Sequence, residues 1–260
     1  MVEKVWGKRV LPAPFVAPAG QRIGEVCFEP PPELDALLVK YIFADENLSV
    51  QLHPSDAQAQ AAGLGRNGKE ECWLVVDAEP GAALAVGFAE PVAPEALRAA
   101  ALDGSIERML AWHPVRAGDF FYLPANTVHA IGAGVSLVEV QQNCDITFRL
   151  YDYGRPRALH LDQGLAVASG QPHDPALRHQ APSRGHAHLV EGPFFRLTRL
   201  DGPPDAAITA RYAGPLLVIP LEGTVSICGE VIAPGGCGKA IGLDTVTFAD
   251  DGLCLITQPL

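Results

Sequence analysis

The sequence lacks the long apolar runs that mark exported and membrane-spanning proteins. No window approaches the roughly 18 apolar residues of a spanning helix, and Met1 to Val10 contains no apolar run of signal-peptide length. We therefore expect a soluble protein that acts in the cytoplasm and does not contact a membrane.

Basic residues are also scarce. Lys and Arg number 19 against 30 Asp and Glu, which gives a formal net charge of −11. This balance argues against nucleic-acid binding and against attachment to an anionic membrane. Any anionic ligand must then be held by a local cluster of positive groups. Hydrophobic residues make up 48% of the 260, so the chain can bury a sizeable core.

Paired cysteines are absent as well. None of the six cysteines forms a C-x-x-C pair, which excludes a zinc-ribbon or thioredoxin-type motif. Most lie inside apolar runs, and we expect them to be buried free thiols.

Short strand-like runs, separated by Gly, Pro, Asp or Asn, dominate the chain and are typical of β-sandwiches and barrels. Leu37–Phe43 and Leu48–His53 flank the polar segment 44–47, which predicts a hairpin. Helical patterning is limited to Pro94–Leu110, with a break near Asp103-Gly104, and to Asp56–Ala62.

The composition changes near Gly170, where a polar, proline-containing stretch begins. We expect a first domain over residues 1–165, with a short helical insertion near 94–110. Residues 166–189 would form a linker or surface excursion, and 190–260 a second, smaller β domain.

Four residues are candidate metal ligands: Gln51, His53, Glu71 and His129. Gln51 and His53 are two apart on a predicted strand, so both project from one face, while Val50 and Leu52 point into a core. Two imidazoles, a carboxylate and an amide oxygen suit a borderline divalent ion such as Zn²⁺.

The stretch Gly118–His129 matches the second cupin motif, G-x5-P-x-G-x2-H, except that Asn126 stands where glycine is usual. Asparagine tolerates a left-handed backbone better than most residues, so the exchange is physically mild. The match indicates a jelly-roll barrel whose mouth holds a metal.

The chain further resembles the type I phosphomannose isomerase family in its short bacterial form. The resemblance covers residues 3–165 well and the second β part loosely. It is carried by four ordered motifs: Gln51-Leu-His-Pro-Ser-Asp56, Gly68-Lys-Glu-Glu-Cys-Trp73, Pro124-Ala-Asn-Thr-Val-His-Ala-Ile-Gly132, and Glu139-Val-Gln-Gln-Asn-Cys-Asp-Ile-Thr-Phe-Arg-Leu-Tyr-Asp152.

The resemblance implies a mainly β fold: a cupin-type jelly roll with a few short helices and a second, metal-free, cupin-like domain. It implies one Zn²⁺ held by Gln51, His53, Glu71 and His129. Glu70 competes with Glu71 for the ligand role; the motif favours Glu71, and strand alternation lets only one of them face the metal.

The implied reaction interconverts mannose 6-phosphate and fructose 6-phosphate through a cis-enediol. Arg149 and Lys69 match catalytic positions of the family. Arg149 lies on a predicted strand, Ile146–Tyr151, and would stabilise the enediolate or bind the phosphate. Whether Lys69, Glu139 or another group moves the proton stays open.

Two other functions compete with the isomerase. A non-catalytic cupin that binds sugar phosphates would keep the metal ligands but lose the catalytic Arg149 or Lys69, and both are present. A metal-dependent cupin oxygenase would favour two histidines and one carboxylate with open positions, which Gln51 disfavours. The expected partner is a small sugar phosphate; the oligomeric state stays open.

Overall fold

The computed structural model describes residues 1–260, and its internal contacts divide them into two compact units. The first unit comprises Met1–Leu11, Ala17–Cys27 and Val39–Gln180, and the second Pro12–Val16, Phe28–Leu38 and Ala181–Leu260. Strands hold 41% of the residues and helices 16%, so the prediction of a mainly β fold is confirmed. The domain boundaries near 165 and 190 stay a prediction.

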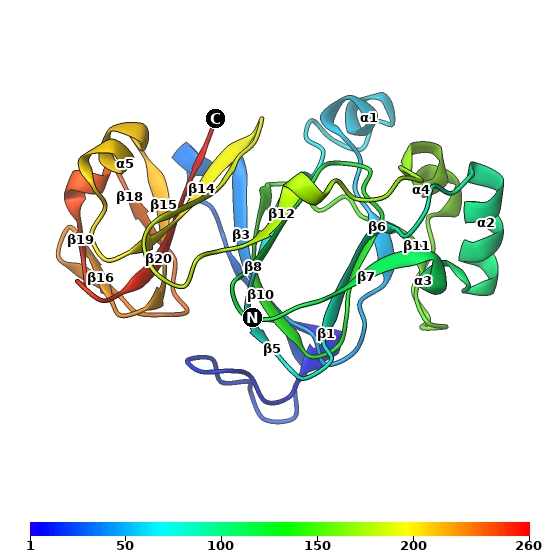
Figure 1. The fold of residues 1–260 in the computed structure, drawn as a ribbon, viewed down its shortest axis with the longest axis horizontal. Coiled ribbons are helices and arrows are strands. Elements are labelled where there is room, and N and C mark those ends of the chain that lie inside the picture. The colour runs from blue at the N-terminus through cyan, green and yellow to red at the C-terminus, as the bar shows by residue number, and fades with distance from the viewer. The chain divides into compact units, whose positions relative to one another are not determined.

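Two antiparallel sheets form the first unit (Figure 1). The seven-stranded sheet has the order β1 (Val2–Lys8), β2 (Ile23–Phe28), β3 (Leu37–Phe43), β10 (Val135–Gln142), β5 (Glu71–Ala78), β8 (Asp119–Leu123) and β12 (Arg178–Gln180). The five-stranded sheet has the order β11 (Phe148–Tyr151), β4 (Val50–Leu52), β9 (His129–Ile131), β6 (Ala83–Phe88) and β7 (Leu110–Pro114).

The five-stranded sheet carries apolar residues on both faces, and each face packs against a different partner. Val86 and Ile131 join a core with Trp73 and Phe121 of the seven-stranded sheet, which is the interior of the barrel. The alternate residues, such as Leu52, pack outward against helices. Because side chains alternate along a strand, this outer packing fixes which residues face the interior.

Three helices cover that outer face: α2 (Pro94–Asp103), α3 (Ile106–Met109) and α4 (Leu161–Val167). Gly104, with φ of +80°, ends α2 and separates it from α3, so the predicted helix with a break is confirmed. Helix α1 (Asp56–Ala61) is also confirmed, and the Ser55 hydroxyl and Gln58 amide cap its start reciprocally. No helix was predicted at α4.

The predicted hairpin between β3 and β4 is wrong, although both strands exist. The connecting segment passes from one sheet to the other: the Ala44 N–H donates to Val135 O at 2.9 Å, and the Leu48 N–H donates to Ile131 O at 2.8 Å. Since Val135 belongs to the seven-stranded sheet and Ile131 to the five-stranded sheet, the turn joins two sheets and not two neighbours.

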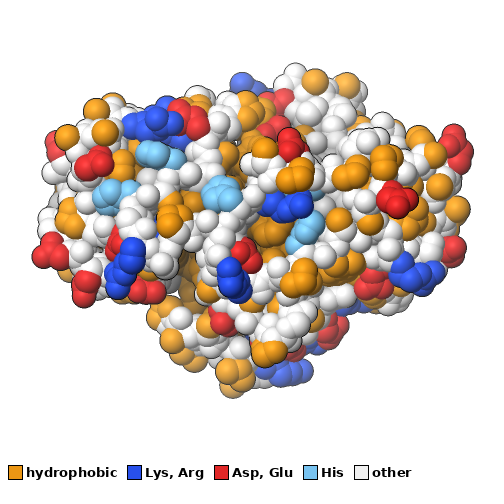
Figure 2. Space-filling model, viewed as in Figure 1, with side chains coloured by type: hydrophobic (Ala, Val, Ile, Leu, Met, Phe, Trp, Pro, Cys, Tyr) orange, Lys and Arg blue, Asp and Glu red, His pale blue; other side chains and the backbone are white.

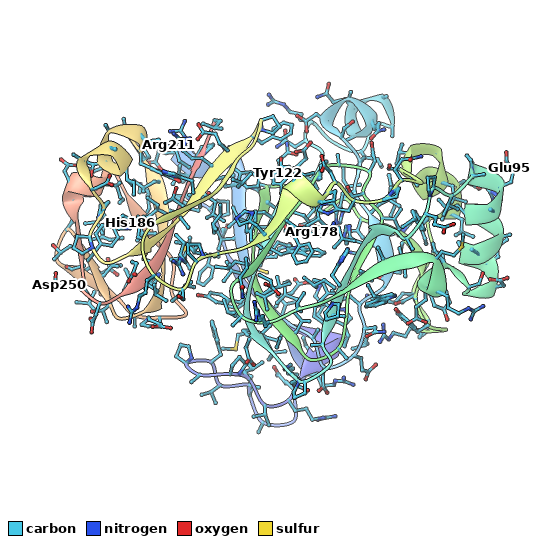
Figure 3. All side chains as sticks on the ribbon, in the orientation of Figure 1. Glu95, Tyr122, Arg178, His186, Arg211 and Asp250 are labelled. Carbon is cyan, nitrogen blue, oxygen red and sulfur yellow. The ribbon has the colours of Figure 1, made fainter.

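Residues 169–180 bond to both sheets of the first unit. The Phe88 N–H donates to Gln171 O at 3.2 Å, beside a bridge between Gly87 and Pro172. The segment then runs through η2 (Pro175–Leu177) into β12, where Arg178 pairs with Phe121 of β8. Figure 3 labels Arg178 on this segment. The segment therefore links β6 of the five-stranded sheet to the β12 edge of the seven-stranded sheet.

The second unit is a β structure with its own core. That core includes Tyr212 and two residues of β20, Cys254 and Ile256. Its five-stranded sheet has the order β13 (Ala187–Glu191), β14 (Phe195–Asp201), β20 (Leu253–Pro259), β15 (Leu216–Glu222) and β18 (Gly238–Ala240). Its three-stranded sheet has the order β17 (Glu230–Ile232), β16 (Val225–Ile227) and β19 (Val246–Phe248). The short helices are η1 (Pro32–Leu34), α5 (Ala206–Arg211) and η3 (Leu243–Thr245).

The surface carries both signs of charge. Figure 2 shows acidic and basic side chains interspersed over the visible face, among apolar and uncharged ones. None of the helices has both the length and the apolar character that crossing a membrane requires.

We predict that alanine at Gly87 is much more destabilising than alanine at Gly81. Both glycines have positive φ, +69° and +85°, so each substitution costs about 1–2 kcal/mol of backbone strain. At Gly87 the new Cβ would also lie 2.5 Å from His173 N, whereas nothing lies within 4 Å at Gly81. Overpacking adds about 1–3 kcal/mol, measured as the difference in free energy of unfolding in urea. Equal losses would contradict the close approach of residues 169–173.

Candidate metal centre and active site

Two histidines reach the barrel interior from neighbouring strands. His53 directly follows β4, and His129 is the first residue of β9, where it lies opposite Gln51. The turn before His129 contains Asn126 with φ of +73°, so the left-handed backbone expected at this position is confirmed. The Asn126 N–H donates to His53 O at 2.7 Å, which ties the two histidine segments together.

Each imidazole is oriented by a backbone carbonyl. His53 Nδ1 lies 2.8 Å from Ile146 O, and His129 Nδ1 lies 2.9 Å from Thr127 O. Because a carbonyl oxygen only accepts, each Nδ1 carries the proton and each Nε2 presents a lone pair. Metal-ligating histidines are held in this way, with one nitrogen donating to the protein and the other facing the ion.

Glu71, the first residue of β5, completes the cluster. Its Oε1 lies 3.6 Å from His53 Nε2 and 3.4 Å from His129 Nε2, and all three side chains are buried. Ligand atoms bound tetrahedrally at about 2.0–2.1 Å lie about 3.3 Å from one another, so these separations match a shared ion closely. His53, Glu71 and His129 form the single cluster of His, Cys, Asp and Glu side chains in residues 1–260 whose ligand atoms converge within 4.8 Å.

The ionisation states of the cluster also fit a cation. Burial lowers the pKa of His53 and of His129, so both imidazoles are neutral near pH 7. Burial alone would raise the pKa of Glu71, but the groups around the carboxylate, Lys69 foremost, together outweigh burial and the pKa is lowered. Glu71 Oε1 and His129 Nε2 are buried without a hydrogen-bond partner. A divalent ion would satisfy both orphaned atoms.

The neighbouring Glu70 does not join this cluster. Its Oε2 accepts a hydrogen bond from the Tyr122 hydroxyl, and its backbone N–H donates to Gln142 Oε1 at 2.9 Å. The structure therefore places Glu71, and not Glu70, with the two histidines. Gln51 lies opposite His129, and its Oε1 accepts from the Ser49 hydroxyl at 2.9 Å. Its role as a fourth ligand stays a prediction.

Lys69 and Glu139 lie against the cluster. Lys69 Nζ is 2.6 Å from Glu71 Oε2, 3.4 Å from Glu139 Oε1 and 3.3 Å from His53 Nε2. Burial would lower the pKa of Lys69, but the Glu139 and Glu71 carboxylates outweigh it and the pKa is raised. The Glu139 carboxylate also accepts from Trp73 Nε1 at 2.9 Å. An acid–base pair is therefore buried beside the candidate metal ligands.

Two further polar groups lie near the cluster. Lys40 Nζ lies 3.8 Å from Glu139 Oε1, and Gln141 lies opposite Glu71 with its Oε1 buried and unpartnered. Lys40 interrupts the otherwise apolar run Leu37–Phe43, which is buried throughout.

Arg149 lies on β11, two strands away from His129. It is directly opposite Gln51, which is opposite His129, so the three side chains share one face of the sheet. The strand begins at Phe148 and not at Ile146 as predicted; Phe148 and Leu150 are buried as expected. Asp145 precedes the strand, and its side chain is 90% exposed, so it does not share a strand face with Arg149.

Comparison with known proteins gives relatives of one kind. No family model matches the chain. The chain is 43% identical over 198 residues to a protein named mannose-6-phosphate isomerase from Streptococcus mutans, an alignment that covers 72% of this chain and 61% of that protein. It is 42% identical over 137 residues to mannose-6-phosphate isomerase ManA from Bacillus subtilis, covering 50% and 43%. The matched lengths are therefore less than two thirds of these relatives.

Solved structures of the same name share the fold over nearly the whole chain. A mannose 6-phosphate isomerase structure from Bacillus subtilis superposes with a TM-score of 0.75 at 21% identity, covering 99% of this chain and 96% of that one. A mutant phosphomannose isomerase from Salmonella typhimurium gives 0.71 at 16% identity, covering 99% and 97%. These likenesses establish the cupin fold.

We predict that the protein binds one divalent ion per chain through this cluster. His129→Ala should weaken zinc binding by more than about 100-fold, because even partners outside the ligand set are worth about 10–100-fold. His179→Ala, a matched change at an exposed histidine outside the cluster, should leave binding unchanged. Titration calorimetry on metal-free protein measures both. Equal affinities for the two variants would contradict the assignment.

Proposed function

We propose that this chain, which belongs to the mannose-6-phosphate isomerase family, interconverts mannose 6-phosphate and fructose 6-phosphate with one zinc ion. The observation that carries the proposal is the buried cluster of His53, Glu71 and His129, which lies beside the Lys69–Glu139 pair. Within it, Glu71 Oε1 and His129 Nε2 have no hydrogen-bond partner. The names of its relatives support the choice of substrate.

The donor set supports zinc among the divalent ions. Two imidazole nitrogens and one carboxylate oxygen suit Zn²⁺ better than the harder Mg²⁺ or Ca²⁺, which prefer oxygen ligands throughout. Gln51, on the same face as His129, is proposed as the fourth ligand. When bound, zinc would supply a Lewis acid for the carbonyl oxygen of the substrate.

The reaction moves one proton between adjacent carbons and needs no external oxidant. The proton leaves C2 of the aldose and is delivered to C1 through a cis-enediol. The hydroxyl proton passes from O2 to O1 at the same time, so that the carbonyl group moves from C1 to C2. We propose that Lys69 or Glu139 carries this proton, because both side chains are buried at the cluster and contact each other. Arg149 would either stabilise the enediolate or bind the phosphate.

The alternative functions fit the site less well. A protein that only binds sugar phosphates would need a cation near the ligand but not an acid–base pair buried against the metal ligands. An oxygenase would leave open positions on the ion, which Gln51 as a ligand would reduce. We expect the partner to be a small sugar phosphate, without nucleic acid or membrane, in the cytoplasm.

The first test of the proposal is an isomerase assay. Purified protein is offered fructose 6-phosphate, and mannose 6-phosphate is measured before chelation, after chelation and after zinc is added back. We expect activity to disappear with the metal and to return with zinc. If zinc-replete protein forms no mannose 6-phosphate but still binds the sugar phosphate, the binding-protein alternative holds. Full activity after complete metal removal would contradict the metal's role.

A second prediction concerns Arg149. Arg149→Ala should lower kcat/KM about 100-fold or more, since removing one preorganised donor to developing charge costs about that much, while bound zinc stays at one per chain. Arg98→Ala is the matched control, because Arg98 is half-exposed and pairs with Asp162 on the surface at 2.7 Å. Near-normal turnover of Arg149→Ala would remove it from the mechanism.

A further inference from the structure

The segment that follows β11 folds back onto Arg149 and holds both its backbone and its side chain. His160 N–H donates to Arg149 O at 2.7 Å, and Arg149 N–H donates to His160 Nδ1 at 3.2 Å. The Arg149 side chain donates from Nη1 to Ala158 O at 2.8 Å. Arg149 Nε is buried and has no hydrogen-bond partner. One hydrogen bond therefore holds the guanidinium, and two hold the backbone that carries it.

His160 accepts from Arg149 only as a neutral ring. Burial, and then the positive charge of Arg149, lower the pKa of His160, so its Nδ1 is free to accept near pH 7. The two hydrogen bonds between His160 and Arg149 resemble a bonded pair in an antiparallel sheet. The difference is that the His160 imidazole nitrogen accepts in place of a backbone carbonyl.

A partly buried ion pair closes the fold-back segment. Arg157 Nε donates to Asp152 Oδ2 and Arg157 Nη2 donates to Asp152 Oδ1, both at 2.6 Å, in a two-bond fork. Asp152 is only 2% exposed. Between them, Tyr153 and Gly154 both have positive φ, and Arg155 N–H donates to Asp152 O at 2.9 Å, which makes a tight turn. The fork fixes the position of the backbone that immediately precedes Ala158.

Without Arg157, the Asp152 carboxylate would keep only a weak hydrogen bond from a second arginine, Arg155. Arg155 Nη1 is 3.3 Å from Asp152 Oδ1, but the same nitrogen donates to Asn47 O at 2.9 Å, and Nη2 donates to Glu46 at 2.9 Å. Arg155 is therefore committed mainly to the 46–47 loop. Loss of Arg157 would leave a buried carboxylate with one long hydrogen bond to a side chain, and the segment would rearrange to solvate it.

We propose that Arg157 is a positioning residue for Arg149: through its fork to Asp152 it fixes Ala158 O, which binds the Arg149 guanidinium, and His160, which holds the Arg149 backbone. The inference rests on the proposed function, because it takes Arg149 to act on the sugar phosphate. Misplacement of an orienting group by about 1 Å is enough to cost up to about 100-fold in rate.

The test is a double-mutant cycle in the isomerase reaction. Arg157→Ala should lower kcat about 10- to 100-fold with zinc content unchanged. In the Arg149→Ala background, the same change should have no further effect, because Arg157 acts only through Arg149. Arg157→Lys keeps a charge but loses the fork, and should lie between Arg157→Ala and the unchanged protein. Arg98→Ala, which removes a surface arginine from the nearby Asp162, should leave kcat unchanged.

Two results would overturn the proposal. If Arg157→Ala raises KM in the Arg149→Ala background as much as in the unchanged protein, Arg157 itself contacts the substrate. If its effect persists in full in the Arg149→Ala background, the ion pair acts by another route. Should Arg157→Ala not fold, Arg157→Lys is measured through the same cycle.

A readout without substrate separates this proposal from the proposed function. The Nε–H of Arg149 is buried, so its proton should exchange slowly with solvent in a nitrogen-15 NMR experiment. Arg157→Lys should accelerate that exchange about 10-fold or more, even if the protein turns out not to be an isomerase. Unchanged exchange in a folded Arg157→Lys protein would show that the fork does not hold Arg149.

Discussion

The Glu71 carboxylate, buried between two neutral imidazoles and one ammonium group, is the feature on which the interior of the barrel depends. An ionised carboxylate is costly to bury unless opposite charge lies close by. Lys69 supplies that charge at 2.6 Å. The Lys69 ammonium also pairs with Glu139, and Glu139 in turn pairs with Lys40. The formal charges of these two lysines and two glutamates cancel. With a divalent ion bound, the net charge becomes +2, which offsets a phosphate dianion. A chain of net charge −11 would thus hold an anion by concentrating positive charge in its interior.

The apolar packing on the outer face of the five-stranded sheet determines which side chains point toward the polar cluster. Leu52 and Phe148 pack outward against the helices, so the alternate residues Gln51 and Arg149 must face inward. A shift of one residue in β4 or β11 would bury polar side chains under the helices and expose apolar ones to the cluster. The helices are therefore needed for function although none of their side chains belongs to the candidate site. They enforce the register in which His129, Gln51 and Arg149 lie side by side.

Patterns of neighbouring residues predicted those features of the fold that depend only on such neighbours. The alternation around Gln51, the break at Gly104 and the left-handed Asn126 were all evident in the sequence, because each depends on a few neighbouring residues. The pairing of β3 with β4 was predicted wrongly because a short polar turn between two strands looks the same whether it closes a hairpin or crosses between sheets. Lys40 was placed near Glu139 only by the pairing of distant strands, which no local pattern encodes.

The fold-back segment shows how stability and site geometry become coupled at one strand. Helix α4 starts directly after His160 and packs on β11 through Gly164, where a Cβ atom would lie 2.7 Å from Leu150 Cδ2. The missing side chain lets the helix approach closely enough for His160 to meet the Arg149 backbone. The outer face of β11 is thus held by α4 while Arg149 is held by the residues that lead into that helix. Any change that moves α4 outward would loosen the outer core and misplace the guanidinium together, so the two effects share one cause.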